Sequence, residues 1–127
     1  MKYLIFLSIL FVSNMILNSC TEAGEGGKAI INVHVIVNEY QAPYAEVKIK
    51  YNATGFPGAG AGYNDIDTCD YAGKTSFRKL RRGNYYVYVT YQSDTSTTIM
   101  EGGATVKISN RIGEQHVVVD LSEADPF

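Results

Sequence analysis

An alternation of apolar and polar side chains runs through most of the chain from residue 29 onwards. Residues 31–37 place four Ile and Val side chains on one face, with Asn32 and His34 on the other, and residues 45–51 repeat the pattern. Successive side chains of a β-strand point to opposite faces, so a period of two is typical of a strand with one buried face. This feature predicts strands at both segments.

The same alternation recurs along the rest of the chain. It is seen at residues 85–91, 104–108 and 115–121. Further strands are expected at 63–69, where the alternation is less clear because Asp and Thr carry it, at 75–77, and at 97–100, broken at Gly102-Gly103. No segment after residue 28 shows a helical period. About seven short strands with turn signals between them predict an all-β fold, a single seven-stranded Greek-key β-sandwich.

One loop stands out between the predicted strands. Residues 52–62, NATGFPGAGAG, are rich in Gly and contain Pro57. Such a composition is typical of a loop and does not sustain a regular element. We therefore expect Phe56 to lie on an exposed loop.

The segment DYAGKTSFRKLRRGNYYVYV resembles a motif of the transthyretin-like, or prealbumin-like, sandwiches. This group includes the carboxypeptidase regulatory-like and collagen-adhesin B-type domains. The matching residues are Gly73 in a turn, Phe77 and Leu80 in the core, and Gly83 and Tyr85 at the start of the next strand. The resemblance implies a prealbumin-like sandwich over residues 28–121. An opening hairpin from Ile31 to Ile49 and a closing pair from Val106 to Leu121 would fit that architecture. The motif identifies a scaffold rather than a reaction.

Residues 1–19 have the features of a bacterial export signal. Lys2 supplies a positive start, residues 3–17 are largely apolar, and Leu17-Asn18-Ser19-Cys20 closes the segment. This ending resembles the lipobox of bacterial lipoproteins, in which a leucine and small residues precede an invariant cysteine. The resemblance implies cleavage before Cys20 and acyl chains such as palmitate on its thiol. Polar residues interrupt the apolar run, which argues against a membrane-spanning helix.

We therefore expect a protein anchored through lipid to the bacterial cell envelope, most simply at the outer membrane or cell surface. Glu22 and Glu25 look like the acidic stretch that accompanies export to the outer face in some Gram-negative bacteria. The expected organisation is a signal peptide at 1–19, a lipidated cysteine and flexible spacer at 20–28, the sandwich at 29–121 and a tail at 122–127.

The net charge and the cysteine content limit the classes of partner and the means of stabilisation. Loss of Lys2 with the signal would change the formal net charge from −2 to −3. Binding of nucleic acid needs a basic footprint, so we expect no nucleic-acid partner. Only Cys69 would keep its thiol after lipidation, so we expect core packing rather than a disulfide to stabilise the domain.

The candidate contact surface is aromatic. Tyr86 and Tyr88 alternate with core-facing residues and are expected on the outer surface of their strand, near the basic residues of segment 78–82. Tyr offers contact area with a polar tip at low entropy cost. With Phe56, these tyrosines predict a surface for an envelope protein or a glycan, on a non-catalytic binding or structural module without a cofactor.

Metal binding is the first alternative. Asp65, Asp67 and Asp70 supply oxygens of the kind that Ca²⁺ prefers. Their spacing does not match an EF-hand loop, and a solvated edge strand is the favoured interpretation. His34 and His116 have no third ligand at a metal-like spacing, so no metal site is predicted.

Two other functions stay open. A small hydrolase or metal-dependent enzyme on the same scaffold would be favoured by a pocket that joins His34 or His116 to the aspartates. An accessory subunit of an envelope complex would pair through an exposed edge strand. No Ser-His-Asp or Cys-His set can be assembled from the sequence, so we predict no catalytic residue and no enzyme.

Overall fold

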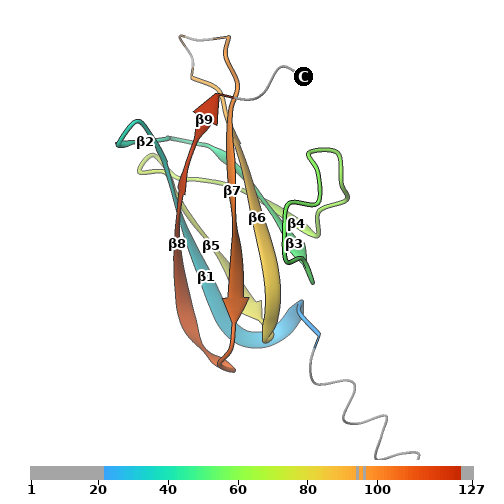
Figure 1. Ribbon diagram of the computed structural model, residues 1–127. Helices are drawn as coiled ribbons and strands as arrows, with labels where there is room; N and C mark the ends of the chain where they lie inside the picture. Colours follow the sequence, from blue (N-terminus) through green and yellow to red (C-terminus); the bar gives the residue numbers. More distant parts are fainter. Residues whose placement is uncertain (1–21, 94, 96, 124–127) are drawn as a thin grey trace, which may run out of the picture.

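The computed structural model describes residues 22–93, 95 and 97–123, which form two β-sheets packed face to face (Figure 1). The predicted signal segment 1–19, Cys20 and the end of the tail after residue 123 lie outside the described residues. The strands are β1 (Glu25–Val37), β2 (Tyr40–Gln41), β3 (Glu46–Tyr51), β4 (Asp65–Thr68), β5 (Lys74–Leu80), β6 (Gly83–Tyr91), β7 (Met100–Ile108), β8 (Ile112–Asp120) and β9 (Ser122–Glu123). The described part contains no helix, and the all-β prediction is confirmed.

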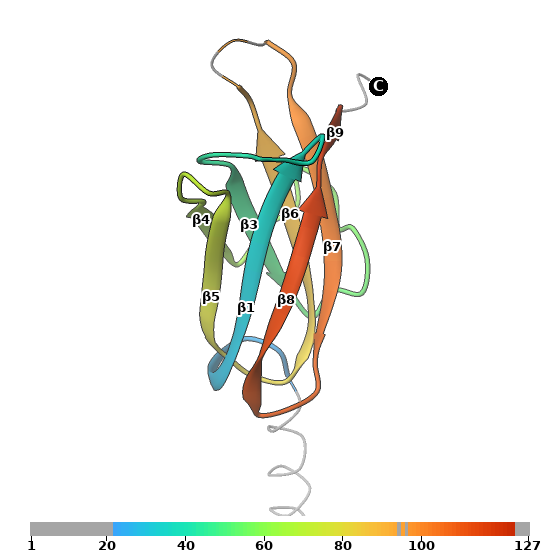
Figure 2. The same cartoon turned by 90° about the vertical axis from the view of Figure 1, so that its left-hand side faces the viewer.

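The two sheets differ in their strand order. In the first sheet β1 lies between β5 and β8, and the short β2 pairs with the last residues of β1. The other sheet has the order β4-β3-β6-β7-β9. β1 and β8 run parallel, whereas every other pair is antiparallel. Figure 2 shows the first sheet in front of the second.

The core fills the space between the sheets. Three strands contribute alternate residues to this core: Ile31, Val33 and Val35 from β1, Val47 and Ile49 from β3, and Tyr85, Val87 and Val89 from β6. All of these side chains are at most 1% exposed, so the predicted alternation on these three strands is confirmed. Burial of each Val or Ile side chain stabilises the fold by about 1.5–3 kcal/mol.

Both predicted strand pairs are wrong. β1 pairs with β2, β5 and β8, while β3 pairs with β4 and β6, so no hairpin joins Ile31 to Ile49. β7 pairs with β6 and β9, and β8 pairs with β1. In each case the chain crosses from one sheet to the other. Because both sheets present apolar inner faces, the alternation shows which side of a strand is buried but not which strand lies beside it.

The predicted break at Gly102-Gly103 is also wrong, because β7 runs through both residues. At Gly103, an added Cβ would lie 2.7 Å from Cζ of Tyr86. At Gly102, it would lie 3.0 Å from the carbonyl oxygen of Asp120. Glycine in a strand often marks such a close approach, so these residues let neighbouring groups reach the strand rather than end it.

The expected spacer is partly folded. β1 begins at Glu25, and Ala23 and Gly24 before it are buried. The backbone N–H of Gly24 donates to the Tyr85 hydroxyl at 2.9 Å. Ala23 lies against Gly83, where an added Cβ would be 2.6 Å from the Ala23 methyl group. At the other end, Ser122–Glu123 pairs with β7 instead of forming a tail.

The motif residues occupy the positions that the resemblance implied. Phe77 and Leu80 are buried in the core. Gly73 has a φ of 77°, and an added Cβ would lie 2.6 Å from the carbonyl oxygen of Val35. Only glycine combines this left-handed conformation with such a close backbone approach.

Within residues 22–93, 95 and 97–123, the structure has no helix with the length and apolar character to span a membrane.

Candidate aromatic binding surface

The outer face of the second sheet carries the candidate site. Tyr86 and Tyr88 project from β6, and their register partners on β3 are Lys50 and Lys48. On the other side, Tyr88 is opposite Gly103 of β7. The absence of a side chain at Gly103 leaves room for the Tyr86 ring, which leans over it. The sheet thus presents two tyrosines bordered by lysines.

The loop between β3 and β4 folds onto this face. In Figures 1 and 2 it stands on the side of the second sheet, away from the first. Several hydrogen bonds hold the loop in this position. Lys50 Nζ donates to the Gly62 carbonyl at 2.6 Å, and the Tyr63 hydroxyl donates to the Gly58 carbonyl at 2.8 Å. The Tyr51 N–H donates to the Asn64 side chain at 2.8 Å, and the Asn64 N–H donates to the Ile49 carbonyl at 2.9 Å.

These contacts build one aromatic cluster from Phe56, Tyr63, Tyr86 and Tyr88. The Phe56 ring lies 5.1 Å from the Tyr88 ring and 5.7 Å from the Tyr86 ring, measured between centroids. Tyr63 stacks on Tyr88 at 5.8 Å and an interplanar angle of 17°. Offset stacks of this kind stabilise a ring pair by about 0.5–1.5 kcal/mol beyond the area they bury. The structure therefore brings together the three predicted residues and adds Tyr63.

The predicted exposure of Tyr88 is wrong. Its side chain is only 5% exposed, because Phe56 and Tyr63 cover it. Tyr86 is half-buried, and Phe56 is 54% exposed. The accessible part of the cluster is thus the Phe56 ring with the edges of Tyr63 and Tyr86, while Tyr88 is its floor.

Charged groups surround the cluster. The Tyr88 hydroxyl donates to Glu101 Oε2 at 2.7 Å. Lys48 lies 3.6 Å from the Glu46 carboxylate, and its Nζ is 5.8 Å from the centre of the Tyr63 ring. Burial first, then the Glu101 hydrogen bond and charge, raise the pKa of Tyr88 to about 12. At neutral pH Tyr88 is therefore a hydrogen-bond donor and Glu101 an acceptor.

The basic residues expected beside these tyrosines lie elsewhere. Arg81 and Arg82 line a pocket at the end of the sandwich, together with the start of β1. That pocket shares no residue with the aromatic cluster. The cations that border the cluster are instead Lys48 and Lys50, which the register of β3 against β6 places there.

The three aspartates make local hydrogen bonds. Asp65 accepts from the Ile66 N–H at 2.8 Å, and Asp67 accepts from the Thr75 hydroxyl. Asp70 accepts from the N–H groups of residues 72 and 74, both at 2.9 Å, and so fixes the turn before β5. Among the described residues, no three His, Cys, Asp or Glu side chains are grouped closely enough to hold a metal ion.

The residues of the enzyme alternative are dispersed. His116 lies opposite Asn32 on the neighbouring strand, with its Nε2 3.7 Å from Glu114, and His34 lies opposite Lys74. Neither histidine lines the pocket at the end of the sandwich. Cys69 is buried, and burial first, then the charges of Asp70 and Asp67, raise the pKa of its thiol to about 11. A thiol in that state is a poor nucleophile at neutral pH.

The chain matches no protein-family model and no curated protein. Among solved structures, it is similar to a protein from Pseudomonas aeruginosa for which carbohydrate binding has been proposed. The TM-score is 0.50 with 16% sequence identity, over 77% of this chain and 91% of the other. At this identity the similarity establishes a shared fold.

Proposed function

We propose that this protein is a lipid-anchored module of the bacterial envelope that binds a glycan, without catalysis, on the aromatic cluster. One observation carries the proposal. Phe56 keeps its ring 54% exposed although that ring is stacked on Tyr88 and lies tilted against Tyr86. An exposed apolar patch, rather than a single exposed apolar side chain, marks an interaction site. Here the exposed Phe56 ring belongs to such a cluster.

The chemistry of the cluster suits a sugar. The faces of many sugar rings carry C–H groups, whose partial positive charge is attracted by the negative face of an aromatic ring. The lysine residues of β3 and the Glu101 carboxylate border the rings and supply donors and an acceptor for hydroxyl groups. The contacts of its ring with Tyr88 and Tyr86 hold Phe56 in place before a ligand arrives, which reduces the entropy lost on binding.

The fold supports the same proposal. The similar protein from Pseudomonas aeruginosa is one with a proposed role in carbohydrate binding, and the chain shares its fold. We also infer that the sandwich is of the Greek-key prealbumin type, in which the seven strands of four or more residues are the expected ones and the two-residue strands β2 and β9 are additional. Two findings support this: the buried positions of Phe77 and Leu80, and the left-handed conformation of Gly73.

The lipid anchor is part of the proposal. It rests on the lipobox-like ending at Cys20, which predicts anchoring at the outer membrane or cell surface. An intact mass of the mature chain tests it. A start at Cys20 with added acyl chains would support it, and a chain that keeps Lys2 or an unmodified Cys20 would disprove it.

Glycan binding is tested by electrophoresis of the full chain, in mild detergent, through native gels containing mannan, dextran, xylan or peptidoglycan fragments. We expect retardation by at least one of them. Phe56→Ala should weaken the affinity for the retarding glycan about tenfold, because the lost ring stacking and the lost buried area together contribute about 1.4 kcal/mol. Tyr71→Ala is the matched control, since Tyr71 is an exposed ring (68%) outside the cluster.

The outcomes separate two candidates. Equal retardation of Phe56→Ala and the unmodified chain would disprove the cluster as the glycan site. The second candidate is a protein contact at Tyr44 and Tyr71, whose exposed rings meet edge to face at 6.3 Å. Crosslinking in the native envelope that is lost in Tyr71→Ala and kept in Phe56→Ala would favour that candidate.

A further inference from the structure

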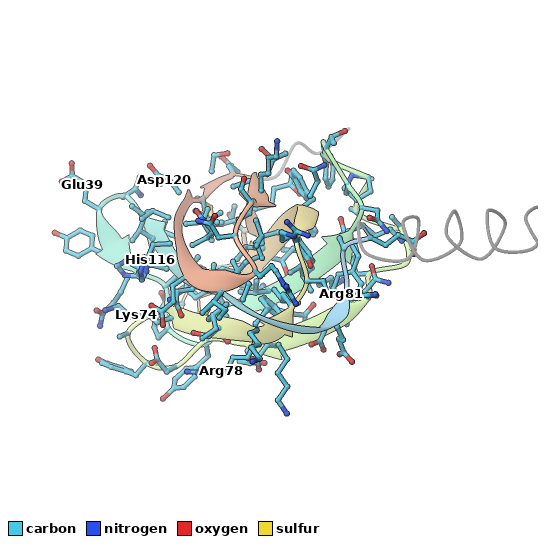
Figure 3. All side chains as sticks on the ribbon, turned by 90° about the horizontal axis from the view of Figure 1, so that it is seen from below. Glu39, Lys74, Arg78, Arg81, His116 and Asp120 are labelled. Carbon is cyan, nitrogen blue, oxygen red and sulfur yellow. The ribbon has the colours of Figure 1, made fainter. Side chains whose placement is uncertain are left out.

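A pocket of about 620 Å³ opens at the end of the sandwich where β1 begins. Its lining comes from the start of β1, the turn between β5 and β6, and the turn between β7 and β8. The lining residues are Gly26, Gly27, Lys28, Arg81, Arg82, Arg111 and Ile112. Figure 3 looks at this end and labels Arg81 beside the beginning of β1. Three segments distant in sequence thus form one concave surface.

The charge of this pocket is strongly one-sided. Four of its lining residues, Lys28 and the three arginines, are cations, and none of the lining residues is acidic. The ion pairs among the described residues join Lys48 to Glu46 and His116 to Glu114, so no described carboxylate pairs with the four cations. A concavity lined by charges of one sign concentrates ligands of the other sign. The pocket therefore suits an anion.

The backbone makes the pocket accessible. Glu25 and Ala29 both pair with Leu80, so the residues between them form a bulge. Within it, Gly26 has a φ of 106° and open space where a Cβ would be, while a Cβ at Gly27 would run into the Leu80 carbonyl. Glycine at a bulge lets another group approach the backbone closely. The backbone of Gly26 and Gly27 is therefore exposed to the pocket beside the cations.

The position of the pocket points to a membrane. Ala23 is only 5% exposed, so its position is fixed by the fold. Three residue steps from Cys20 to Ala23 span at most about 11 Å. A lipid on Cys20 would therefore hold this end of the sandwich against the bilayer. Ile112, on the pocket rim, is 72% exposed and has an apolar side chain suited to the lipid surface.

We propose that this pocket binds the phosphate of an anionic phospholipid headgroup and orients the sandwich with this end on the membrane. The guanidinium group presents a fork of donors that matches phosphate oxygens, and three arginines stand here. The choice of a membrane lipid as the source of the phosphate rests on the proposed lipid anchor. The orientation leaves the aromatic cluster, on the outer face of the second sheet, free for its ligand.

The test uses the full mature chain in nanodiscs of phosphatidylcholine alone or with 30% phosphatidylglycerol. Hydrogen exchange is measured on peptides covering residues 24–29 and 109–114. We expect phosphatidylglycerol to slow exchange in both peptides at least fivefold, the factor that one cation near an anionic membrane surface supplies. Arg81→Gln with Arg111→Gln should abolish this gain. Lys74→Gln with Arg78→Gln, which removes the same charge from exposed positions on β5, should retain it.

Each other outcome has a definite meaning. Equal exchange in both nanodiscs, with the chain attached to both, would disprove the headgroup site and leave the anchor intact. Attachment to the phosphatidylglycerol discs alone would disprove the anchor and support the pocket. Protection by 10 mM inorganic phosphate in phosphatidylcholine discs, equal to that by phosphatidylglycerol, would assign the pocket to free phosphate and overturn the lipid. Stronger protection by an acidic polysaccharide would overturn it in favour of a glycan.

Discussion

Removal of one buried hydroxyl group should loosen the junction between the start of the chain and the sandwich. The Tyr85 side chain is fully buried. Its hydroxyl donates to the Arg81 carbonyl at 2.6 Å and accepts from the Gly24 N–H at 2.9 Å. Tyr85→Phe keeps the ring but leaves the buried Gly24 N–H and the part-buried Arg81 carbonyl without this partner. The variant therefore isolates the contribution of the hydroxyl.

The expected destabilisation follows from those two groups. A buried polar group left unpaired costs about 1–3 kcal/mol, so we expect the free energy of unfolding to fall by about 2–3 kcal/mol. For a urea m-value of about 2 kcal/mol per M, the midpoint should fall by about 1 M. Hydrogen exchange at residues 24–27 should also become faster, since Gly24 loses its bond to β6.

The control is Tyr40→Phe, because the Tyr40 side chain is 78% exposed and its substitution should change the stability by less than about 0.5 kcal/mol. Urea unfolding followed by circular dichroism measures both variants. A Tyr85→Phe variant as stable as Tyr40→Phe would refute the role assigned to the hydroxyl.

Two further changes probe the aromatic cluster. The pKa of Tyr88, raised by burial and then by Glu101 to about 12, exceeds the value of about 10 in an unfolded chain. The folded state therefore retains the Tyr88 proton, and the free energy of unfolding should fall as the pH rises from 10 to 12. In Tyr88→Phe this fall should be smaller, and equal slopes in the two proteins would count against the assignment. Gly103→Ala places a Cβ 2.7 Å from Cζ of Tyr86 and 2.7 Å from the carbonyl oxygen of Val87, so it should displace that ring, weaken glycan retention and also lower the free energy of unfolding. Retention unchanged from that of the unmodified chain would contradict the packing of Tyr86 over Gly103.

The sequence predicts those features that depend on one strand at a time. The alternation around Val33, Val47 and Val87 identifies the buried face of β1, β3 and β6, and each face is buried in the structure. The turn glycine at Gly73, which the resemblance implied, has a φ of 77°, a conformation that belongs to one residue and its neighbours. Local periodicity and local conformation are therefore readable without the fold.

Features that depend on contacts between distant segments could not be predicted in the same way. Tyr88 alternates as an outward residue should, yet Phe56 and Tyr63 from another loop cover it. Gly103 resembles a strand breaker in sequence, but its role is to admit the ring of Tyr86. The segment before Glu25 has the composition of a linker. It is nevertheless fixed, because the hydroxyl of a tyrosine 61 positions away reaches Gly24.

The membership of the aromatic cluster could be predicted in part. Tyr86, Tyr88 and Phe56 are brought together by the structure, whereas Tyr63 gave no separate signal because its neighbours are polar or glycine. The basic pocket was missed for a similar reason. Lys28, Arg81 and Arg111 are far apart in the chain, and only the shared end of the two sheets places them around one concavity.

The most direct test of glycan binding is an NMR titration of the full chain, labelled in its aromatic rings, with an oligosaccharide from whichever polysaccharide retards it. We predict that the resonances of Phe56 and Tyr86 shift together and reach saturation, while those of Tyr71 stay in place. Saturable shifts confined to Tyr71, or no ring shift at any concentration, would contradict a glycan site on the second sheet.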